Sequence, residues 1–528
     1  MATNLVFDPS HFEELIAEYG IKKAWINILA TRIHNSDQKF HYILQDKSFR
    51  GKKILKTDLL EGLSIGEIGV LYEYCVAHVD ANSRKDNGQF FTPDDVAILM
   101  AKQSLNFPDG RWLDPCSGIG NLSWHLVNIH DDKESFLINS MILSDRDELA
   151  LFIARVLFTL SFQNKHKHLF QEIEPNFVKF DFLSVADNRE QLLFESSGLE
   201  KIPLHDYVIV NPPYLSIKGE DTRFETSKSR DLYAYFLENI IKTSKGFISI
   251  TPQSFTNAGK FFQLRKLLLE RYKSLIIYTF DNIPGNIFFG VKFGSTNSNT
   301  ANSIRACILV ADNHTKEPKQ LITSLLRWRT NERAELFQQL DKFLSSPQLT
   351  EDFFPKVNSK FISLYNQVSK LPRLSTILSP NETKYALHIP AAPRYFISAL
   401  KKPVSRTSLK TIYFNNPSDL NRAYLLLNSS FMYWWWRVRD GGMTLSFETI
   451  SSLPLLNFEA DKSLVAKLVK SETSNMVFKL NAGAMQENVK HDASLISEIN
   501  KLVCPKFSRQ LLLTHENSEL VQLKKSKP

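Results

Sequence analysis

The sequence predicts an α/β fold in which helices cover both faces of a parallel sheet. Residues 86–312 alternate short apolar runs with longer amphipathic segments. The strand candidates are RWLDP, INSMILSD, FVKFDF, HDYVIVN, GFISITP, SLIIYTF and IRACILVAD. Helical patterns such as PDDVAILMAKQSL, DELALFIARVLFTLSF and DLYAYFLENIIKTS lie between most of them. This alternation is typical of parallel strands joined by helices.

The length of 528 residues exceeds what a single core normally holds, so more than one domain is expected. Apolar residues at three-to-four spacing in FEELIAEYGIKKAWINILATRI predict an N-terminal helical segment over residues 1–85. The polar stretch NHTKEPKQ near residue 313 ends the alternating pattern. We therefore expect an α/β domain over 86–315 and a second domain over 320–528 that ends in a helical tail.

Composition and charge narrow the class of protein. The chain is 43% apolar and 23% charged, and it shows neither a membrane-length apolar run nor a secretory leader, which predicts a cytoplasmic protein without a membrane partner. The net charge is +8, and residues 313–528 alone carry 30 Lys+Arg and 18 Asp+Glu. This basic half favours a nucleic acid partner, although a merely soluble basic domain has the same composition. The four cysteines lack metal-ligand spacing, so no metal site is predicted.

A glycine turn follows the first strand of the α/β domain, in WLDPCSGIGNLSWHL. Gly118 and Gly120 can adopt backbone angles forbidden to other residues, and the next helix offers free N–H groups. Asp114, at the strand end, can accept hydrogen bonds. The pattern fits a nucleotide-type site at the carboxyl edge of a parallel sheet, but a plain tight turn is equally compatible because the third Gly of a dinucleotide fingerprint is missing.

Polar residues also end the neighbouring strands. Asp145 ends MILSD, where an acidic residue suits ribose hydroxyls, although it could instead cap the next helix. Asp181 and Phe182 in VKFDFLS could bind an adenine amino group and ring, or act as a cap and a core residue. Thr92 and Pro93 precede an amphipathic helix, where they fit the N-cap and first turn or, alternatively, a carboxylate-binding helix end.

The stretch VIVNPPYL predicts a strand that ends in a sharp, rigid corner. Three apolar residues run directly into Asn211, Pro212, Pro213 and Tyr214. Two successive prolines end a strand abruptly, because proline has a fixed φ and no backbone N–H. The corner therefore either holds a polar and an aromatic side chain in fixed positions, or is an ordinary strand end followed by a buried Tyr.

Taken in order, GQFFTP, DPCSGIG, the acidic strand ends and NPPY resemble the γ-class N6-adenine DNA methyltransferases of restriction–modification systems. The likeness covers about residues 86–312. DLYAYFLE, GFISITPQSF and NSSFMYWWW followed by LP are similar to further parts of that family. The resemblance implies a Rossmann-like S-adenosylmethionine-dependent methyltransferase domain between the N-terminal helical segment and a C-terminal target-recognition domain.

The resemblance also implies a catalytic arrangement. The Asn211 side-chain oxygen and the Pro212 carbonyl would accept both hydrogens of an adenine N6 amine, which localises its lone pair towards the methyl donor. The rigid corner, which includes Pro213, preorganises these acceptors. Tyr214 would stack on the flipped base. A second stacking aromatic falls in GNIFFGVKFGS, where Phe288 and Phe289 compete; spacing to Ser295 favours Phe289, and either could instead be core.

By the same resemblance, S-adenosyl-L-methionine would occupy the strand-end site. Thr92 would hold the methionine carboxylate, and Asp145 the ribose hydroxyls. The remaining donor contacts are Asp114, Gly118 and Gly120 for the methionine and ribose region and Asp181 and Phe182 for the adenine.

Double-stranded DNA is the implied partner, and a cognate restriction endonuclease is a candidate second partner; no oligomeric state is predicted. The target adenine would be flipped out of the duplex, and the basic second domain would contact phosphates and base edges. Candidate contacts, each of which could be an ordinary solvated charge, are Arg327, Arg329, Lys401, Lys402, Arg437 and Arg439. The run from Trp434 to Trp436 is expected in the core.

Two alternatives remain open. A modification subunit that needs separate specificity or nuclease chains would share these motifs, and so would an RNA or protein-glutamine methyltransferase that carries NPPY. The large basic second domain argues against the glutamine enzymes. A fused nuclease is disfavoured because residues 1–85 are short and contain no PD…(D/E)xK cluster.

Overall fold

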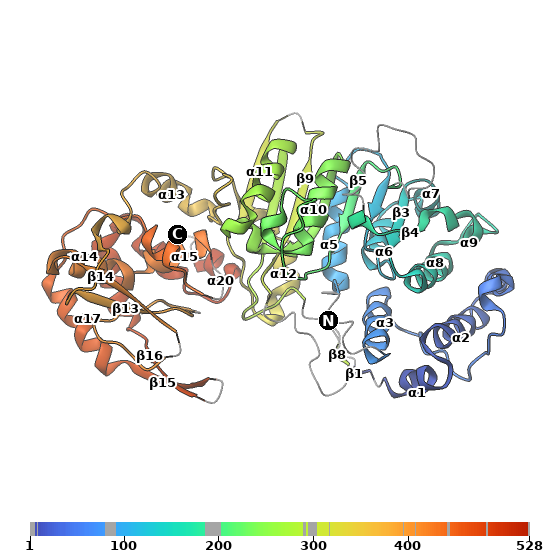
Figure 1. The fold of residues 1–528 in the computed structure, drawn as a ribbon, viewed down its shortest axis with the longest axis horizontal. Coiled ribbons are helices and arrows are strands. Elements are labelled where there is room, and N and C mark those ends of the chain that lie inside the picture. The colour runs from blue at the N-terminus through green and yellow to red at the C-terminus, as the bar shows by residue number, and fades with distance from the viewer. Residues whose placement is uncertain are drawn as a thin grey trace.

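Figure 1 shows the computed structural model, an elongated molecule with the helices of the N-terminal segment at one end and the C-terminal lobe at the other. The structure describes residues 6–7, 9–79, 91–184, 202–288, 292–293, 304–315, 317–393, 395–406, 408–440, 444–481 and 484–525. In these ranges no helix is both long enough and apolar enough to cross a membrane.

A nine-stranded sheet forms the centre of the molecule, in the order β11-β10-β7-β9-β6-β5-β2-β3-β4. The pairings run parallel from β4 to β6 and between β7 and β10, whereas β9 and β11 pair antiparallel with their neighbours. The predicted α/β class is therefore confirmed. The strands are β2 (Trp112–Asp114), β3 (Met141–Asp145), β4 (Phe177–Lys179), β5 (Tyr207–Val210), β6 (Gly246–Pro252), β7 (Ser274–Thr279), β9 (Ala306–Asp312), β10 (Lys319–Thr323) and β11 (Leu344–Ser345).

Helices cover both faces of this sheet, as strand patterning requires. In β5, Tyr207 and Ile209 belong to one buried cluster and Val208 and Val210 to the opposite one, because successive side chains point to opposite faces. The helices of this part are α5 (Asp94–Ser104), α6 (Asn121–Asn128), α7 (Lys133–Asn139), α8 (Glu148–Phe162), α9 (Leu169–Glu172), α10 (Leu232–Thr243), α11 (Phe262–Arg271) and α12 (Arg333–Phe337).

The N-terminal segment is helical, as its periodicity predicts. Its helices pack on the outer side of α8, where Trp25 and Leu29 share a buried cluster with Ile153 and Val156. They are α1 (Ser10–Tyr19), α2 (Ile21–His34) and α3 (Ile65–Val79). A short strand, β1 (Val6–Phe7), pairs in parallel with β8 (Lys292–Phe293).

The C-terminal lobe packs helices around a three-stranded sheet of order β12-β14-β13. The side chains of Trp434, Trp435 and Trp436 are buried in its core, as predicted. The elements are α13 (Ile362–Val368), β12 (Leu378–Ser379), β13 (Ala386–Pro390), β14 (Leu409–Phe414), α14 (Pro417–Asn428), α15 (Ser430–Arg439), α16 (Phe447–Ser451), α17 (Lys462–Ser474), β15 (Met476–Asn481), β16 (Ala484–Val489), α18 (Ala493–Val503), α19 (Ser508–Leu513) and α20 (Glu519–Lys525).

The boundary that the sequence places at residues 315–320 is wrong, because the central sheet continues beyond it. Strand β10 pairs in parallel with β7, and Leu326 and Trp328 lie in the same core as the strands of the α/β domain. Phe354 is buried against the opposite face, and Leu520 of α20 returns to the core of the α/β domain from the end of the chain. The polar stretch NHTKEPKQ therefore runs from the end of β9 into the start of β10 and is not a linker between domains.

Two of the candidate DNA contacts are buried where the lobes meet, so their prediction is wrong. Arg437 donates to Asp281 (2.7 Å) and to the Leu325 carbonyl. Arg327 donates to the Tyr433 hydroxyl and to a backbone carbonyl. Both guanidinium groups therefore hold the C-terminal lobe to the central sheet and cannot contact a duplex.

The four remaining candidates lie nearer the surface. The Arg439 side chain pairs with an exposed glutamate, and Lys401 donates to the side chain of Asn421. Arg329 and Lys402 are exposed. Among the six residues considered, these last two are the ones classed as exposed.

Candidate functional site

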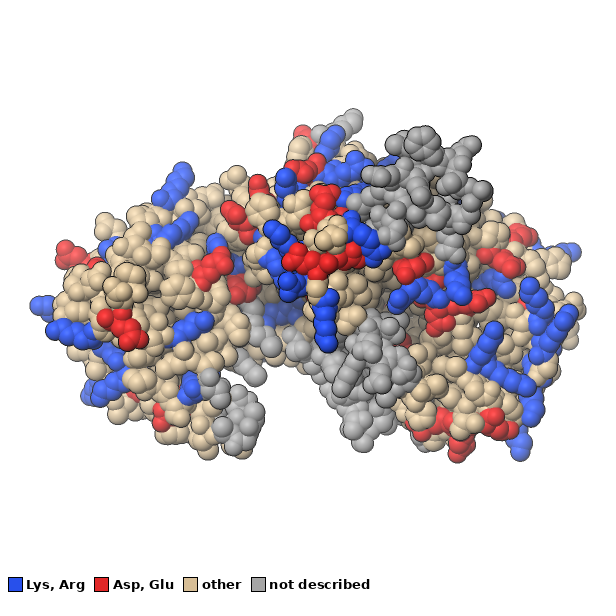
Figure 2. All heavy atoms as spheres, in the orientation of Figure 1, with Lys and Arg blue, Asp and Glu red and all other residues tan. Residues whose placement is uncertain are grey.

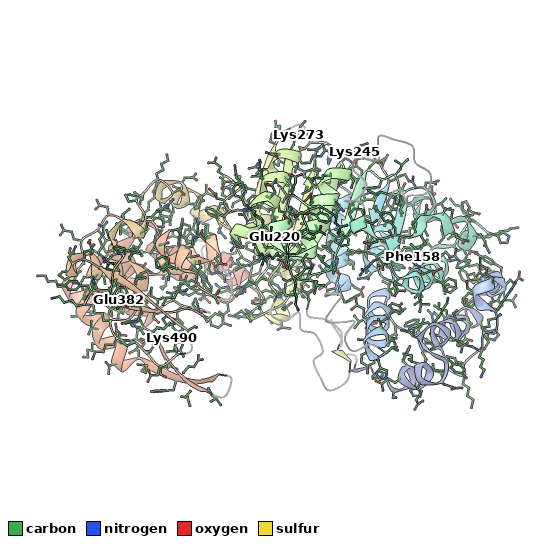
Figure 3. All side chains as sticks on the ribbon, viewed as in Figure 1. Phe158, Glu220, Lys245, Lys273, Glu382 and Lys490 are labelled. Carbon is green, nitrogen blue, oxygen red and sulfur yellow. The ribbon has the colours of Figure 1, made fainter. Side chains whose placement is uncertain are left out.

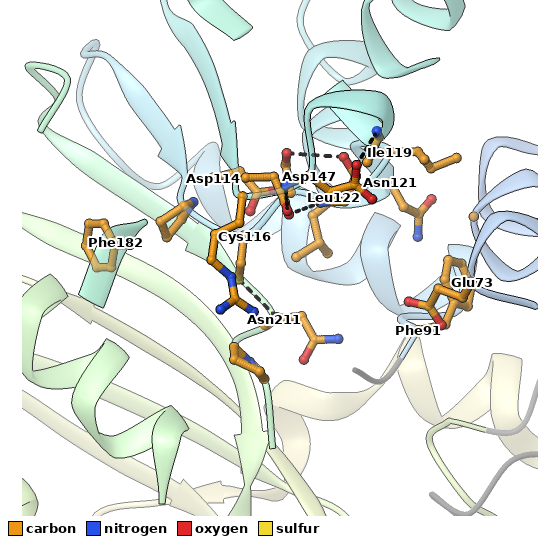
Figure 4. A pocket seen from close by; sticks show the side chains of 18 of the residues that line it. Glu73, Phe91, Asp114, Cys116, Ile119, Asn121, Leu122, Asp147, Phe182 and Asn211 are labelled. Carbon is orange, nitrogen blue, oxygen red and sulfur yellow. Dashed lines mark hydrogen bonds between the residues drawn. The ribbon is translucent and has the colours of Figure 1, made fainter. Parts of the chain in front are cut away.

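A cavity of about 490 Å³ lies at the carboxyl ends of β2, β3 and β5 (Figure 4). Its position follows from topology, since the carboxyl ends of parallel strands meet at one sheet edge. It brings together side chains that lie far apart in the sequence. The predicted site residues that line it are Thr92, Asp114, Gly118, Asp145, Asp181, Phe182, Asn211 and Pro213.

The glycine turn has the conformation that its sequence predicts. Gly118 (φ 52°) and Gly120 (φ 86°) both lie in the left-handed region, which favours glycine. Gly118 lines the cavity, and its N–H donates to the Asp145 carboxylate at 2.8 Å. A Cβ at Gly120 would come within 2.8 Å of the Leu143 and Phe158 side chains. Gly120 is therefore required for close packing behind the turn, whereas Gly118 faces the cavity.

Asp114 is a buried carboxylate on the cavity wall. Its exposed fraction is 1%, and one carboxylate oxygen accepts a hydrogen bond from Ser123 at 2.9 Å. The other oxygen, Oδ1, is buried and has no hydrogen-bond partner among the residues that the structure describes. Burial raises the pKa of Asp114 to about 7, against the hydrogen bonds from Ser123 and the Cys116 backbone. The buried Oδ1 of Asp114 can therefore accept a hydrogen bond from a ligand that carries an N–H or O–H group.

Asn121 supplies a second acceptor that the sequence analysis did not single out. It lies at the first position of α6 and lines the cavity. Its Nδ2 donates to the Thr92 carbonyl at 2.7 Å, which fixes the amide orientation. Its Oδ1 is buried and, within the described ranges, has no partner. Asparagine after a glycine turn is an ordinary helix-start residue, so no sequence signal separates this role from capping.

The acidic residues lie at or just after the strand ends, as predicted. Some of their hydrogen bonds go to backbone N–H groups of nearby turns. Asp145 accepts the backbone N–H groups of Gly118 and Asp147, and burial raises its pKa although these bonds oppose the rise. Asp147, not Asp145, is the N-cap of α8. Asp181 is exposed and accepts from the Leu183 N–H, whereas Phe182 is buried and packs against Phe236. The strand-end carboxylates therefore shape the glycine turn and also line the cavity.

Thr92 connects the two ends of the site. Helix α5 begins one residue later than predicted, so Pro93 is the N-cap and Thr92 precedes it. The Thr92 hydroxyl accepts a hydrogen bond from Asn211 Nδ2 at 3.0 Å instead of capping the helix. Its carbonyl accepts from Asn121. The residue thus joins the glycine-turn helix to the Asn-Pro-Pro-Tyr corner.

The Asn-Pro-Pro-Tyr corner opens onto the cavity directly after β5. The Asn211 carbonyl accepts from the Cys116 thiol at 3.2 Å, so the corner is bonded to the turn that follows β2. Pro213 lines the cavity and Pro212 is buried. The Tyr214 hydroxyl donates to the Ile250 carbonyl at 2.8 Å, and burial raises its pKa well above the usual value. The ring is therefore fixed in place as a neutral phenol.

Of the two competing phenylalanines, Phe288 is buried and its ring contacts Tyr214 edge-on, with centroids 6.1 Å apart. Phe289, which the sequence analysis favours, lies outside the described residues.

Helix α3 forms a wall of the cavity that the sequence did not predict. Gly69, Tyr72 and Glu73 line it. The Tyr72 hydroxyl donates to Asp147 at 2.5 Å, which ties α3 to the start of α8. A Cβ at Gly66 would come within 2.8 Å of the Asp94 carboxylate, so glycine allows the close approach to α5. In Figure 4, Glu73 lies beside Phe91, across the cavity from Phe182.

A nucleotide-type cavity at the carboxyl edge of a doubly covered, mostly parallel sheet defines a class of cofactor-binding α/β proteins. Within that class, residues 139–288 match the family model described as Eco57I restriction-modification methylase. The type II methyltransferase M.PstI of Providencia stuartii is 26% identical over 217 residues, which is 39% of this chain and 40% of that protein. M.BsuBI of Bacillus subtilis is 25% identical over 229 residues, 38% of this chain and 40% of that protein.

The chain thus spans 40% of the length of each of these curated relatives. A solved structure, a DrdV–DNA complex studied by cryo-electron microscopy, covers 74% of this chain and 46% of its own, with 13% identity and a TM-score of 0.41, a likeness too low to carry an argument. The family model and the two relatives confirm the resemblance to methyltransferases of restriction–modification systems. The γ class and the adenine target stay predictions.

Proposed function

We propose that this protein transfers a methyl group from S-adenosyl-L-methionine to N6 of an adenine that is flipped out of duplex DNA. One observation supports this most directly. The cavity that receives the glycine turn and the strand-end carboxylates also receives Asn211 and Pro213 of the Asn-Pro-Pro-Tyr corner. A donor site and a site for an exocyclic amine are therefore adjacent, as group transfer between two bound molecules requires.

The cavity fits the methyl donor in size and in chemistry. Its volume of about 490 Å³ lies within the usual range of cofactor sites. The two acceptors described above, Asp114 Oδ1 and Asn121 Oδ1, are matched by an α-ammonium group, which brings three N–H donors. The Thr92 hydroxyl, whose oxygen accepts from Asn211, has its own proton to donate to a carboxylate. The remaining assignments, Gly118, Asp145, Asp181 and Phe182, follow the resemblance.

The Asn-Pro-Pro-Tyr corner would prepare the target nitrogen. An adenine N6 lone pair is delocalised into the ring and is a poor nucleophile. Because Asn211 Nδ2 donates to Thr92, the amide is held so that Oδ1 is its acceptor for N6–H. The Pro212 carbonyl would accept the second hydrogen, which localises the lone pair on N6. The bound donor supplies the electrophilic methyl on its sulfonium. Fixed acceptors of this kind need no reorganisation during the reaction.

Tyr214 would provide the surface on which the flipped base stacks. Its hydroxyl donates to the Ile250 carbonyl, and its ring makes edge contacts with the rings of Tyr233 and Phe288. A ring fixed in this way loses little entropy when a base binds. Flipping itself is required because N6 inside a duplex cannot reach a cavity at a sheet edge.

The proposal extends to partners. The C-terminal lobe would read the duplex, and residues 313–528 carry 30 Lys+Arg against 18 Asp+Glu. Of the individually predicted contacts, Arg329 and Lys402 remain exposed. A cognate endonuclease would act on the same sequence. If the chain instead serves as a modification subunit, it will transfer methyl groups only after specificity chains are added.

The test begins with sequencing host DNA for N6-methyladenine in strains with and without the gene. In vitro, Asn211→Ala should reduce methyl transfer below detection, because N6 loses an oriented acceptor. Its affinity for S-adenosyl-L-methionine, measured by calorimetry, should change by less than about threefold, since the removed group faces the base.

Asn139→Ala is the matched control, because Asn139 is an exposed asparagine of α7. It should behave as the unmodified protein in both assays. Full turnover by Asn211→Ala, or methylated RNA or glutamine as the product, would contradict the proposal.

A further inference from the structure

A two-stranded hairpin of the C-terminal lobe carries an apolar face. Strand β15 pairs antiparallel with β16, with Leu480 opposite Met485 and Phe478 opposite Glu487. Alternate residues of a strand share a face, and directly opposite residues do so as well. Phe478, Leu480 and Met485 therefore lie together on one face near the end of the hairpin.

These three side chains are unusually exposed for their size. Their exposed fractions are 61% for Phe478, 72% for Leu480 and 59% for Met485. Single exposed apolar residues need no explanation, but three on one face of one hairpin point to a binding surface. The base of the hairpin is anchored, because Val489 is fully buried and Glu487 exchanges backbone and side-chain hydrogen bonds with Ser405.

The hairpin lies at one edge of the C-terminal lobe. Figure 1 shows β15 and β16 at the lower edge of the C-terminal lobe, pointing towards the side on which α3 lies. Figure 2 shows the molecular surface hollowed beside the C-terminal lobe along this edge.

The charges near the hairpin favour a polyanion. Lys402, Lys470 and Lys490 are exposed, and Lys490 directly follows β16 (Figure 3). Two nearby carboxylates are engaged in hydrogen bonds: Glu487, which shares the face of Phe478, accepts the Ser405 N–H, and Glu472 accepts the Lys401 N–H and the Tyr424 hydroxyl. Exposed lysines therefore lie on segments around the hairpin.

We propose that this hairpin enters a groove of duplex DNA and places Phe478, Leu480 and Met485 against the base edges. The major groove of B-DNA admits a two-stranded ribbon and displays the apolar methyl of thymine, while the exposed lysines would contact phosphates. A second copy of this chain is a poorer occupant, because a stable dimer buries about 800 Å² on each partner, far more than three side chains offer. The inference rests on the proposed function, since it assigns part of the base readout.

The test combines Phe478→Ser, Leu480→Ser and Met485→Ser in the full chain. Methyl transfer is measured at limiting concentrations of genomic DNA from a strain that lacks the gene. The triple variant should transfer at least about tenfold more slowly through a higher KM for DNA, because each lost base contact weakens site binding. The Kd for S-adenosyl-L-methionine and the urea midpoint should not change, since the three side chains are exposed. The matched control combines Leu105→Ser and Leu204→Ser, whose side chains are also exposed and lie elsewhere.

Unchanged KM for DNA in the triple variant would overturn the inference while leaving the proposed function intact. A wild-type dimer that the triple variant turns into a monomer in sedimentation would also overturn it. If the wild type transfers no methyl group, the proposed function fails, and anisotropy with labelled duplex from the same DNA decides the hairpin separately. Weaker binding by the triple variant then supports the inference, and equal or absent binding overturns it.

Discussion

Replacing Asp114 by Asn should make the protein more stable and a poorer binder of the methyl donor. Asp114 is 1% exposed, and burial raises its pKa from 3.8 to about 7. A carboxyl whose pKa is higher in the folded state binds more protons there. The stability of the wild type therefore falls as pH rises from about 4 to about 7. The Asn variant has no charge to bury and should lack this dependence.

The magnitude follows from the same values. Each pH unit between the unfolded and folded pKa corresponds to about 1.36 kcal/mol, so the ionised Asp114 costs the folded state about 4 kcal/mol at pH 8. An Asn side chain can still accept the hydrogen bond from Ser123. The variant should thus exceed the wild type in free energy of unfolding by up to about 4 kcal/mol at pH 8, and this excess should shrink as the pH falls from about 7 towards about 4.

Binding of the donor should show the opposite effect. A charge-assisted bond from the ligand ammonium to Asp114 is worth about 1.5–3 kcal/mol, so Asp114→Asn should weaken affinity for S-adenosyl-L-methionine roughly tenfold to a hundredfold. In the wild type, affinity should fall about tenfold for each pH unit below the pKa of about 7, because a proton competes with the ammonium. In the variant this pH dependence should disappear.

Urea denaturation and calorimetry at pH 5, 6, 7 and 8 measure both effects on the same samples. A variant that is less stable than the wild type at pH 8, with a difference independent of pH, would refute the assignment of a costly buried charge. Donor affinity that is equal in the two proteins would refute the ammonium contact.

Two further predictions concern contacts that hold the site together. Tyr72→Phe removes the hydroxyl that donates to Asp147, so it should cost about 1.5–3 kcal/mol in urea denaturation and lower donor affinity several-fold; unchanged affinity would show that α3 needs no such tie. Asp281→Ala leaves Arg437 buried without its carboxylate and should cost about 3–5 kcal/mol, whereas Arg439→Ala at an exposed ion pair should cost less than about 1 kcal/mol; similar losses in both would contradict the structural role of the buried pair.

The residues that sequence reasoning located best stand at the ends of parallel strands. Asp114, Asp145 and Asn211 each follow a short apolar run, and the topology of a parallel sheet brings such ends together without further information. The rigid corner at Pro212 and Pro213 can also be predicted from local sequence, because two successive prolines end a strand.

The residues that sequence reasoning missed depend on packing between distant segments. Tyr72 and Glu73 lie in a helix whose periodicity reports only that one face is buried, not that the cavity lies against it. Asn121 looks like any helix-start residue. Arg327 and Arg437 resemble phosphate contacts by charge, but their partners come from segments more than 100 residues away in the chain. Burial of a charge depends on tertiary partners, which a local pattern does not encode.

Because α3 contributes a wall of the cavity, a methyl donor bound in the proposed site would contact two parts of the chain at once. A ligand that binds only when both parts are in place adds its binding free energy to their association, about 2.7 kcal/mol at a concentration a hundredfold above Kd. Binding of the donor would therefore stabilise the packing of the N-terminal helices against the α/β domain, a contact distant from the reacting base.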